Sequence, residues 1–95
     1  KNNVKINDHV HIAHNCLINE STLIAGCVNI SGSVIIGENC WIGSNSTIRD
    51  GVNVGSSCHI GIASVITKNI PSATRIASIA NLTYRDVIKY TKILK

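Results

Sequence analysis

Histidines and cysteines are the side chains of this sequence best suited to chemistry near neutral pH. The four histidines are His9, His11, His14 and His59, and the four cysteines are Cys16, Cys27, Cys40 and Cys58. A neutral imidazole can act as a general base or as a metal ligand. A thiol needs to become a thiolate to do either, and these cysteines lack the CxxC spacing of a zinc or redox site. We therefore interpret them as free thiols of a cytoplasmic protein.

A six-residue repeat determines where these side chains can lie. Isoleucine or valine recurs every six residues from Ile6 to Ile66, and a small or β-branched residue follows each of them four positions later. Because side chains alternate across a strand, a triplet such as Val10-His11-Ile12 turns its outer residues inward and its middle residue outward. The residues between triplets are rich in Asn, Asp, Ser and Gly, which favour corners. The pattern predicts a coil of short strands, because a period of six fits an α-helix poorly.

Length and charge narrow the class of protein. A chain of 95 residues buries only a modest fraction of its surface, so partner chains can add to its stability. The net charge is +4, and the basic residues gather in residues 68–95. No apolar run approaches the roughly 20 residues of a membrane span, and the basic-aromatic pattern of nucleic-acid-binding proteins is absent. We predict a protein that neither spans a membrane nor binds nucleic acid.

The repeat resembles that of the bacterial hexapeptide-transferase family over residues 6–71. In that family three repeats form one 18-residue turn of a triangular left-handed parallel β-helix, and the left hand is implied by this resemblance alone. The expected fold class is therefore all-β, a single-stranded left-handed parallel β-helix over residues 1–71. Val4 already occupies an inward position of a repeat that would begin before Lys1. We therefore interpret the chain as a fragment whose N-terminal part is missing.

The six-residue pattern is expected to stop at Pro71, and an extended cap segment is expected over residues 72–82, including one more extended piece over 74–79. A short basic α-helix is expected over 83–95. Thr83 and the acidic residue three positions later have the spacing of a capping box. Apolar residues then recur on one helical face.

Outward residues form three columns if each turn holds 18 residues. The columns are His11, Asn29, Thr47 and Val65; Leu17, Ile35 and Asn53; and Leu23, Trp41 and His59. Large apolar groups on flat outer faces usually mark an interface, and the family resemblance implies a homotrimer. Trp41 has a second interpretation, as one wall of a groove for the acyl donor. Cys40 and Cys58 share an inward column and are expected to be stacked core residues without a disulfide.

His14 and Gly32 are the candidate catalytic pair. His14 lies at a corner, and Gly32 occupies the same corner one turn later, where it leaves room and exposes its backbone N–H. Acyl transfer needs a base near the acceptor and a donor for the developing oxyanion. Residues 11–16, with 24–27 and 30–33 after them, resemble the core of UDP-3-O-acylglucosamine N-acyltransferases. This resemblance implies that His14 is the general base and that Gly32 lends its N–H to the oxyanion.

The same resemblance implies the substrates. The donor would be an acyl group on acyl carrier protein or on CoA, and the acceptor the amine of a nucleotide-linked amino sugar, as in lipid A or surface glycan biosynthesis. No tightly bound cofactor and no metal are implied. The basic helix would contact an acidic carrier protein through Arg85, Lys89 and Lys92. The related acetyl-CoA-dependent N-acetyltransferases have a similar site, so the site does not separate the two donors.

Departures from these families keep other interpretations open. A second histidine common in the lipid-pathway enzymes falls near Gly51, and Ser78-Ile79-Ala80-Asn81 replaces a Gly-x-Pro-Ala turn. Asp50 shares the corner column of His14 but is two turns away, too far to orient it.

His9 and His14 have the spacing of two zinc ligands of γ-class carbonic anhydrases, whose third ligand would lie upstream of this chain. A non-catalytic scaffold is the third interpretation, and His9 and His59 are otherwise surface residues.

Overall fold

The computed structural model describes residues 3–77 and Arg85. The basic helix expected over residues 83–95, including Lys89 and Lys92, lies outside the described residues except for Arg85, which is exposed. The cap segment expected over 72–82 is described as far as Ala77. Within the described residues no helix is long and apolar enough to cross a membrane.

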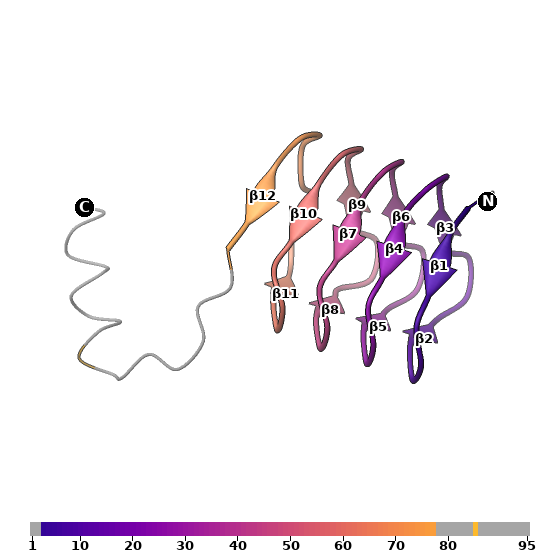
Figure 1. Ribbon diagram of the computed structural model, residues 1–95, viewed down its shortest axis with the longest axis horizontal. Coiled ribbons are helices and arrows are strands. Elements are labelled where there is room, and N and C mark those ends of the chain that lie inside the picture. Colours follow the sequence, from indigo (N-terminus) through magenta and orange to yellow (C-terminus); the bar gives the residue numbers. More distant parts are fainter. Residues whose placement is uncertain (1–2, 78–84, 86–95) are drawn as a thin grey trace.

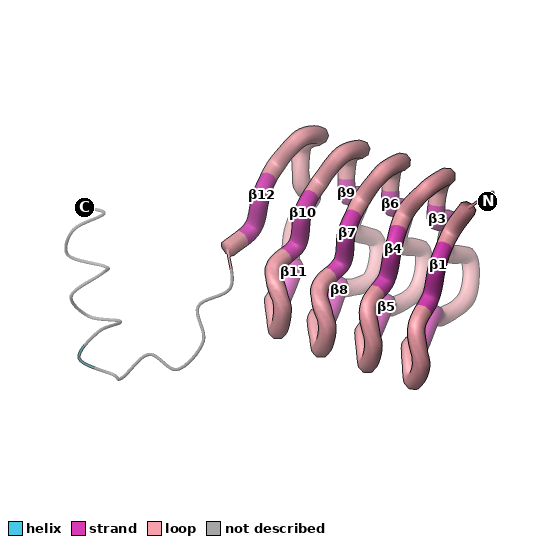
Figure 2. The backbone as a smooth tube through the Cα atoms, viewed as in Figure 1, coloured by secondary structure: helices cyan, strands magenta, loops and turns pink. Residues whose placement is uncertain are grey.

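Short parallel strands and corners make up the described chain (Figure 1, Figure 2). The strands are β1 (Lys5–Ile6), β2 (His11–Ile12), β3 (Leu17–Ile18), β4 (Leu23–Ile24), β5 (Asn29–Ile30), β6 (Ile35–Ile36), β7 (Trp41–Ile42), β8 (Thr47–Ile48), β9 (Asn53–Val54), β10 (His59–Ile60), β11 (Val65–Ile66) and β12 (Arg75–Ile76). Each strand from β1 to β11 contains the last two residues of a predicted triplet. The strands begin where the alternating pattern predicts them, because the inward isoleucine of each triplet fixes its phase.

Three parallel sheets form the sides of a tube. The first sheet has the order β1-β4-β7-β10-β12, the second β11-β8-β5-β2, and the third β3-β6-β9. Partners such as His11 and Asn29, or Leu17 and Ile35, are 18 residues apart. In Figure 1 the chain descends on the near side through β1, returns upward behind through β3 and advances from right to left, which is a left-handed winding. The predicted fold and all three outward columns are confirmed.

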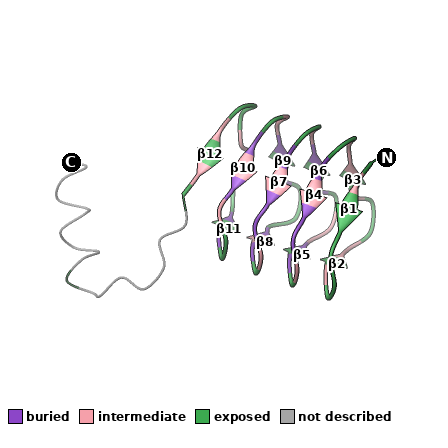
Figure 3. Ribbon diagram, in the orientation of Figure 1, coloured by how far each residue is buried: buried purple, intermediate pink, exposed green. Residues whose placement is uncertain are grey.

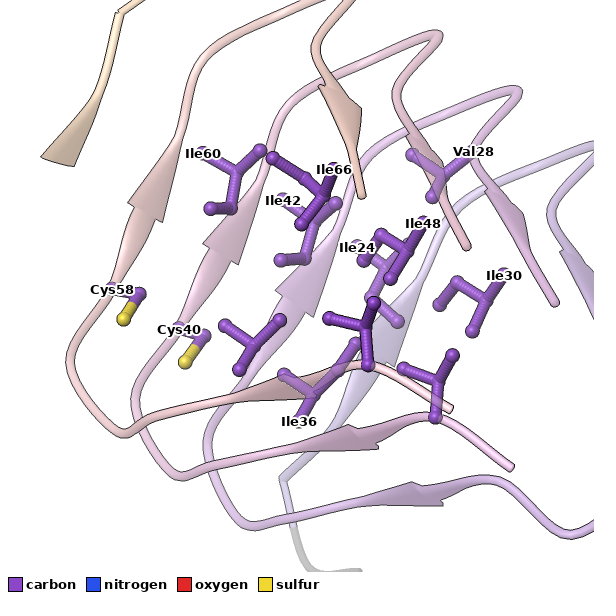
Figure 4. Close-up of a cluster of buried hydrophobic side chains, with 13 residues drawn as sticks. Ile24, Val28, Ile30, Ile36, Cys40, Ile42, Ile48, Cys58, Ile60 and Ile66 are labelled. Carbon is purple, nitrogen blue, oxygen red and sulfur yellow. The ribbon is translucent and has the colours of Figure 1, made fainter. Parts of the chain in front are cut away.

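The interior of the tube is a ladder of isoleucines (Figure 4). Ile24, Ile36, Ile42 and Ile60 are fully buried, as are their equivalents in the other strands of the middle turns. Burying such a side chain contributes about 1.5–3 kcal/mol. Exposure is greatest at the corners and in the first turn, where Ile6 is 47% exposed (Figure 3). The tube is therefore held together by stacking between turns, so its two ends are the least buried.

Each corner except that of residues 67–69 turns through a residue with positive φ. Residues such as Asn15, Ser33 and Asn45 have φ close to 60°. Asparagine and serine are the commonest residues at these positions, and their short polar side chains suit corners. The backbone N–H of the corner residue donates to a carbonyl of the preceding turn, as Ser33 does to His14 at 3.0 Å. The corners are thus stacked by hydrogen bonds as regularly as the strands.

The strict six-residue pattern breaks close to Pro71, because the last turn is two residues shorter than the others. Ile70 bridges to Val54, and β12 pairs with β10 in the register Ile76 to Ile60, so both pairs are 16 residues apart. Ile70 therefore takes the third position of a triplet, where we had predicted the first. The Asn69 side chain accepts a hydrogen bond from the backbone N–H at position 53, at 2.9 Å. β12 adds a fifth strand to the first sheet within the expected extended piece.

Candidate active site

His14 lies on the edge of the tube where the second sheet meets the third. Its corner joins β2 to β3, and its side chain is exposed. The ring packs over Gly32: a Cβ atom added to Gly32 would lie 3.1 Å from Cε1 and 3.2 Å from Nε2 of His14. The 18-residue register therefore brings together the two residues of the predicted pair.

Gly32 leaves space for the imidazole and keeps a free donor beside it. Its φ lies outside the left-handed region, so the backbone does not require glycine there. Its carbonyl accepts a hydrogen bond from Gly51 N–H at 2.9 Å, whereas its own N–H has no hydrogen-bond partner among residues 3–77. At the equivalent corner position of the next edge, the Glu38 N–H donates to Ser56 Oγ at 3.0 Å. No such hydroxyl covers Gly32, since Asp50 stands one turn later.

The other side of the imidazole faces Asn15. The side-chain Nδ2 of Asn15 lies 3.4 Å from Nδ1 of His14. The ring therefore lies over Gly32 with Nδ1 beside the Asn15 amide. An exposed imidazole in this position can exchange protons with a bound group.

Trp41 lies on the first sheet, the side of the tube that does not border the His14 edge. Its ring stacks on that of His59, with centroids 4.4 Å apart and an interplanar angle of 25°. Both side chains are half-buried. Sequence reasoning placed them in one column but took His59 as an ordinary surface residue. Within one chain Trp41 and His14 are on opposite sides of the core, so they can line one site only if two chains contribute.

The inward cysteines are hydrogen-bonded core residues. Cys40 and Cys58 are buried free thiols, as predicted. Their sulfur atoms donate to the carbonyls of Gly55 at 3.0 Å and Pro71 at 3.1 Å. Burial raises the pKa of the Cys40 thiol above its usual value. A neutral, buried thiol is a poor nucleophile, so these side chains belong to the fold.

The remaining histidines and carboxylates do not converge with His14. His9 lies at the corner between β1 and β2, whereas His14 lies at the corner after β2, so the two occupy different edges. Across residues 3–77 and Arg85, no three His, Cys, Asp or Glu side chains are placed to hold a metal ion. Asp50 is exposed on the His14 edge, two turns away as predicted.

The described part of a single chain contains no pocket for a ligand. The edge that carries His14 is convex, and its side chains point into solvent. A small-molecule site normally buries most of its ligand. A substrate over His14 would therefore need a second wall from outside the described residues of this chain.

Comparisons with known proteins identify the repeat. The family model described as the hexapeptide repeat of succinyl-transferase matches residues 33–68. Among solved structures, serine acetyltransferase isoform 3 of Entamoeba histolytica, in complex with cysteine, is similar with 17% sequence identity and a TM-score of 0.45. That match covers 98% of this chain and 42% of the other, so this chain spans less than half of that enzyme. No curated protein matches the chain.

Proposed function

We propose that this chain carries the base and the oxyanion donor of an acyltransferase. The observation that supports the proposal is the packing of the His14 imidazole over Gly32, whose N–H has no hydrogen-bond partner within residues 3–77. The hexapeptide-repeat match over residues 33–68 favours acyl transfer as the class of reaction. The donor is a thioester of acyl carrier protein or CoA, and the acceptor is the amine of a nucleotide-linked amino sugar.

The reaction uses one proton and one thiolate leaving group. Nε2 of His14 takes a proton from the acceptor amine as its nitrogen attacks the thioester carbonyl. The Gly32 N–H donates to the oxyanion that forms. When the tetrahedral intermediate collapses, the C–S bond breaks and the imidazolium returns its proton to the departing thiolate. General base catalysis supplies roughly 10²–10⁴-fold, and one oxyanion donor about 10²–10³-fold.

The convex His14 edge is completed by a second copy of this chain, in a homotrimer. The third sheet, which borders this edge, exposes Leu17 and Ile35 at 42% and 41%. Neighbouring apolar side chains on a flat sheet commonly mark a protein interface. In such an assembly Trp41 of a neighbouring chain is the candidate wall for the acyl group.

Donor recognition is proposed for the basic C-terminal residues. Arg85 is exposed, and Lys89 and Lys92 follow it in the sequence. Cations spaced in this way suit the acidic surface of a carrier protein or the phosphates of CoA. The acetyl-CoA-dependent alternative uses the same His14 and Gly32 and differs only in the donor.

Thioester consumption tests the proposal. The 95-residue chain is incubated with acyl carrier protein thioester or acetyl-CoA and a panel of nucleotide amino sugars. His14→Ala is expected to lower turnover by roughly 10²–10⁴-fold. His11→Ala is the control, because His11 is exposed and pairs with Asn29 on β5, while the atoms nearest the Gly32 Cβ position all belong to His14. Equal rates for wild type and His14→Ala would reject His14 as the base. A stoichiometric zinc ion in the purified protein would instead favour the metalloenzyme interpretation.

A further inference from the structure

Asn15 differs from the other corner asparagines in what its side chain contacts. Asn15, Asn39 and Asn45 occupy equivalent corner positions with φ of 60°, 57° and 61°. Asparagine tolerates this left-handed conformation, which accounts for the residue type at all three corners. Within residues 3–77 the amides of Asn39 and Asn45 make no hydrogen bond, whereas Nδ2 of Asn15 lies 3.4 Å from Nδ1 of His14. Backbone conformation does not require this contact.

The contact is made by the ring nitrogen that lies farther from Gly32. A Cβ atom on Gly32 would lie 3.2 Å from Nε2 and 3.6 Å from Nδ1 of His14, and Nδ1 is the nitrogen beside the Asn15 amide. A neutral imidazole carries its proton on one nitrogen and accepts at the other. Nε2 can act as a base only when the proton is on Nδ1, and an acceptor beside Nδ1 favours that tautomer.

The side-chain amide of asparagine can hydrogen-bond to either neutral tautomer of the imidazole, as a donor or as an acceptor. Rotation of the amide by half a turn exchanges Nδ2 and Oδ1 without changing the shape of the side chain. In the orientation that the structure records, Nδ2 is toward the ring, so Asn15 donates to Nδ1 and the proton is on Nε2. With Oδ1 toward the ring, Asn15 accepts from Nδ1–H and Nε2 is left unprotonated.

We propose that Asn15 is a positioning residue that selects the reactive tautomer of His14, by accepting Nδ1–H through Oδ1 and leaving Nε2 free beside Gly32. The inference rests on the proposed acyl transfer. The acceptor's proton moves to Nε2 and gives an imidazolium whose Nδ1–H remains bonded to Oδ1. The proton on Nε2 then passes to the thiolate, and the starting tautomer is restored without a further reactant.

No charged side chain hydrogen-bonds to the His14 ring within the described residues, so the neutral amide of Asn15 can select its tautomer. The titratable or charged groups on the elements that meet at this edge are His11 on β2, Cys16 after the corner, and Arg49 and Asp50 two turns away. None of them hydrogen-bonds to His14 side-chain atoms in the described residues. A neutral amide orients the ring but stabilises the imidazolium less than a carboxylate would. The ring therefore returns its proton readily to the leaving group.

Nitrogen-15 NMR of the histidine ring tests the inference without any substrate. The shifts of Nδ1 and Nε2 above the titration of His14 report which nitrogen holds the proton. Wild type is expected to be enriched in the Nδ1–H form relative to Asn15→Gly, which keeps a residue that tolerates positive φ but removes the amide. Asn45→Gly is the matched control, since it changes an equivalent exposed corner on another edge. The same tautomer ratio in wild type and Asn15→Gly would overturn the proposal.

The kcat, KM and pH–rate profile of Asn15 variants distinguish an effect on the position of the His14 ring from an effect on folding. Asn15→Gly is expected to lower kcat about tenfold with little change in KM, as for the loss of one neutral hydrogen bond. Asn15→Asp is expected to recover much of kcat and to move the acidic limb of the pH–rate profile to higher pH, because a carboxylate favours the imidazolium. Unmoved pH profiles in both variants would contradict the role. If His14→Ala retained full activity the proposed function would fail, while the NMR result would still decide the tautomer.

Discussion

The imidazole of His14 lies so close to the backbone of Gly32 that a side chain on Gly32 would press against it, with a Cβ 3.1 Å from Cε1 of His14. The two residues are 18 positions apart, and stacking of consecutive turns joins them. A side chain at this corner would therefore displace the exposed imidazole by a few tenths of an ångström, although the backbone conformation is open to other residues.

Gly32→Ala is expected to reduce kcat/KM by about 10-fold to 100-fold with little loss of stability. The added methyl group shifts the imidazole by a few tenths of an ångström, and small displacements of a catalytic group are costly. Thioester consumption and thermal unfolding measure the two effects. Gly26→Ala is the matched control, because its Cβ would meet Asp8 O at an ordinary 3.5 Å. Equal kcat/KM for both alanine variants would contradict the steric role.

Gly37→Ala is expected to destabilise the tube by about 1–3 kcal/mol, as for other overpacked sites. Its Cβ would lie 2.6 Å from the backbone nitrogen of Ser56, in the next turn, and backbone cannot move aside without disturbing the stacking. Urea unfolding of Gly37→Ala and Gly26→Ala measures the difference. A stability equal to that of Gly26→Ala would show that the turns can separate freely.

The stability of the protein is expected to fall as pH rises above the usual thiol range. The pKa of Cys40 is raised from 9.0 chiefly by burial, so the folded state keeps its proton to higher pH than the unfolded state. Between the unfolded and folded pKa values the unfolded chain binds fewer protons, which lowers the free energy of unfolding. Urea unfolding between pH 8 and pH 10, in wild type and Cys40→Ala, checks this. The same pH slope in both proteins would be inconsistent with the assignment to Cys40.

Asn69→Ala is expected to loosen the shortened last turn by about 1 kcal/mol, the usual contribution of one hydrogen bond. The variant removes the Oδ1 atom that accepts from the Asn53 N–H at 2.9 Å. Amide hydrogen exchange at Asn53 should accelerate, while exchange at Asn29 in an 18-residue turn should not. Unchanged protection of the Asn53 amide would mean that another group holds this corner.

Ile35→Lys is expected to dissociate the proposed trimer. Ile35 is 41% exposed on the third sheet beside Leu17, and a lysine buried against apolar neighbours would be desolvated without a partner. Sedimentation measures the mass of the assembly, with Asn29→Lys on the second sheet as the control. A full-size assembly in Ile35→Lys would place the interface elsewhere.

The repeat by itself determined the strands, the inward isoleucines and the corner positions of His14 and Gly32. These features follow from local rules, because side chains alternate along a strand and each corner has a fixed length. The 18-residue turn and its left hand came from family resemblance, and the structure confirms both.

Only the tertiary structure decided the register of the last, shorter turn and the side-chain contacts between neighbouring turns. Ile70 is apolar in either register, so sequence could not reveal that two residues are missing from the last turn. The stacking of Trp41 on His59 and the approach of Asn15 to His14 depend on side-chain rotation. Spacing along the chain fixes which residues share a column, whereas packing of the folded turns selects the rotamers and hydrogen-bond partners within it.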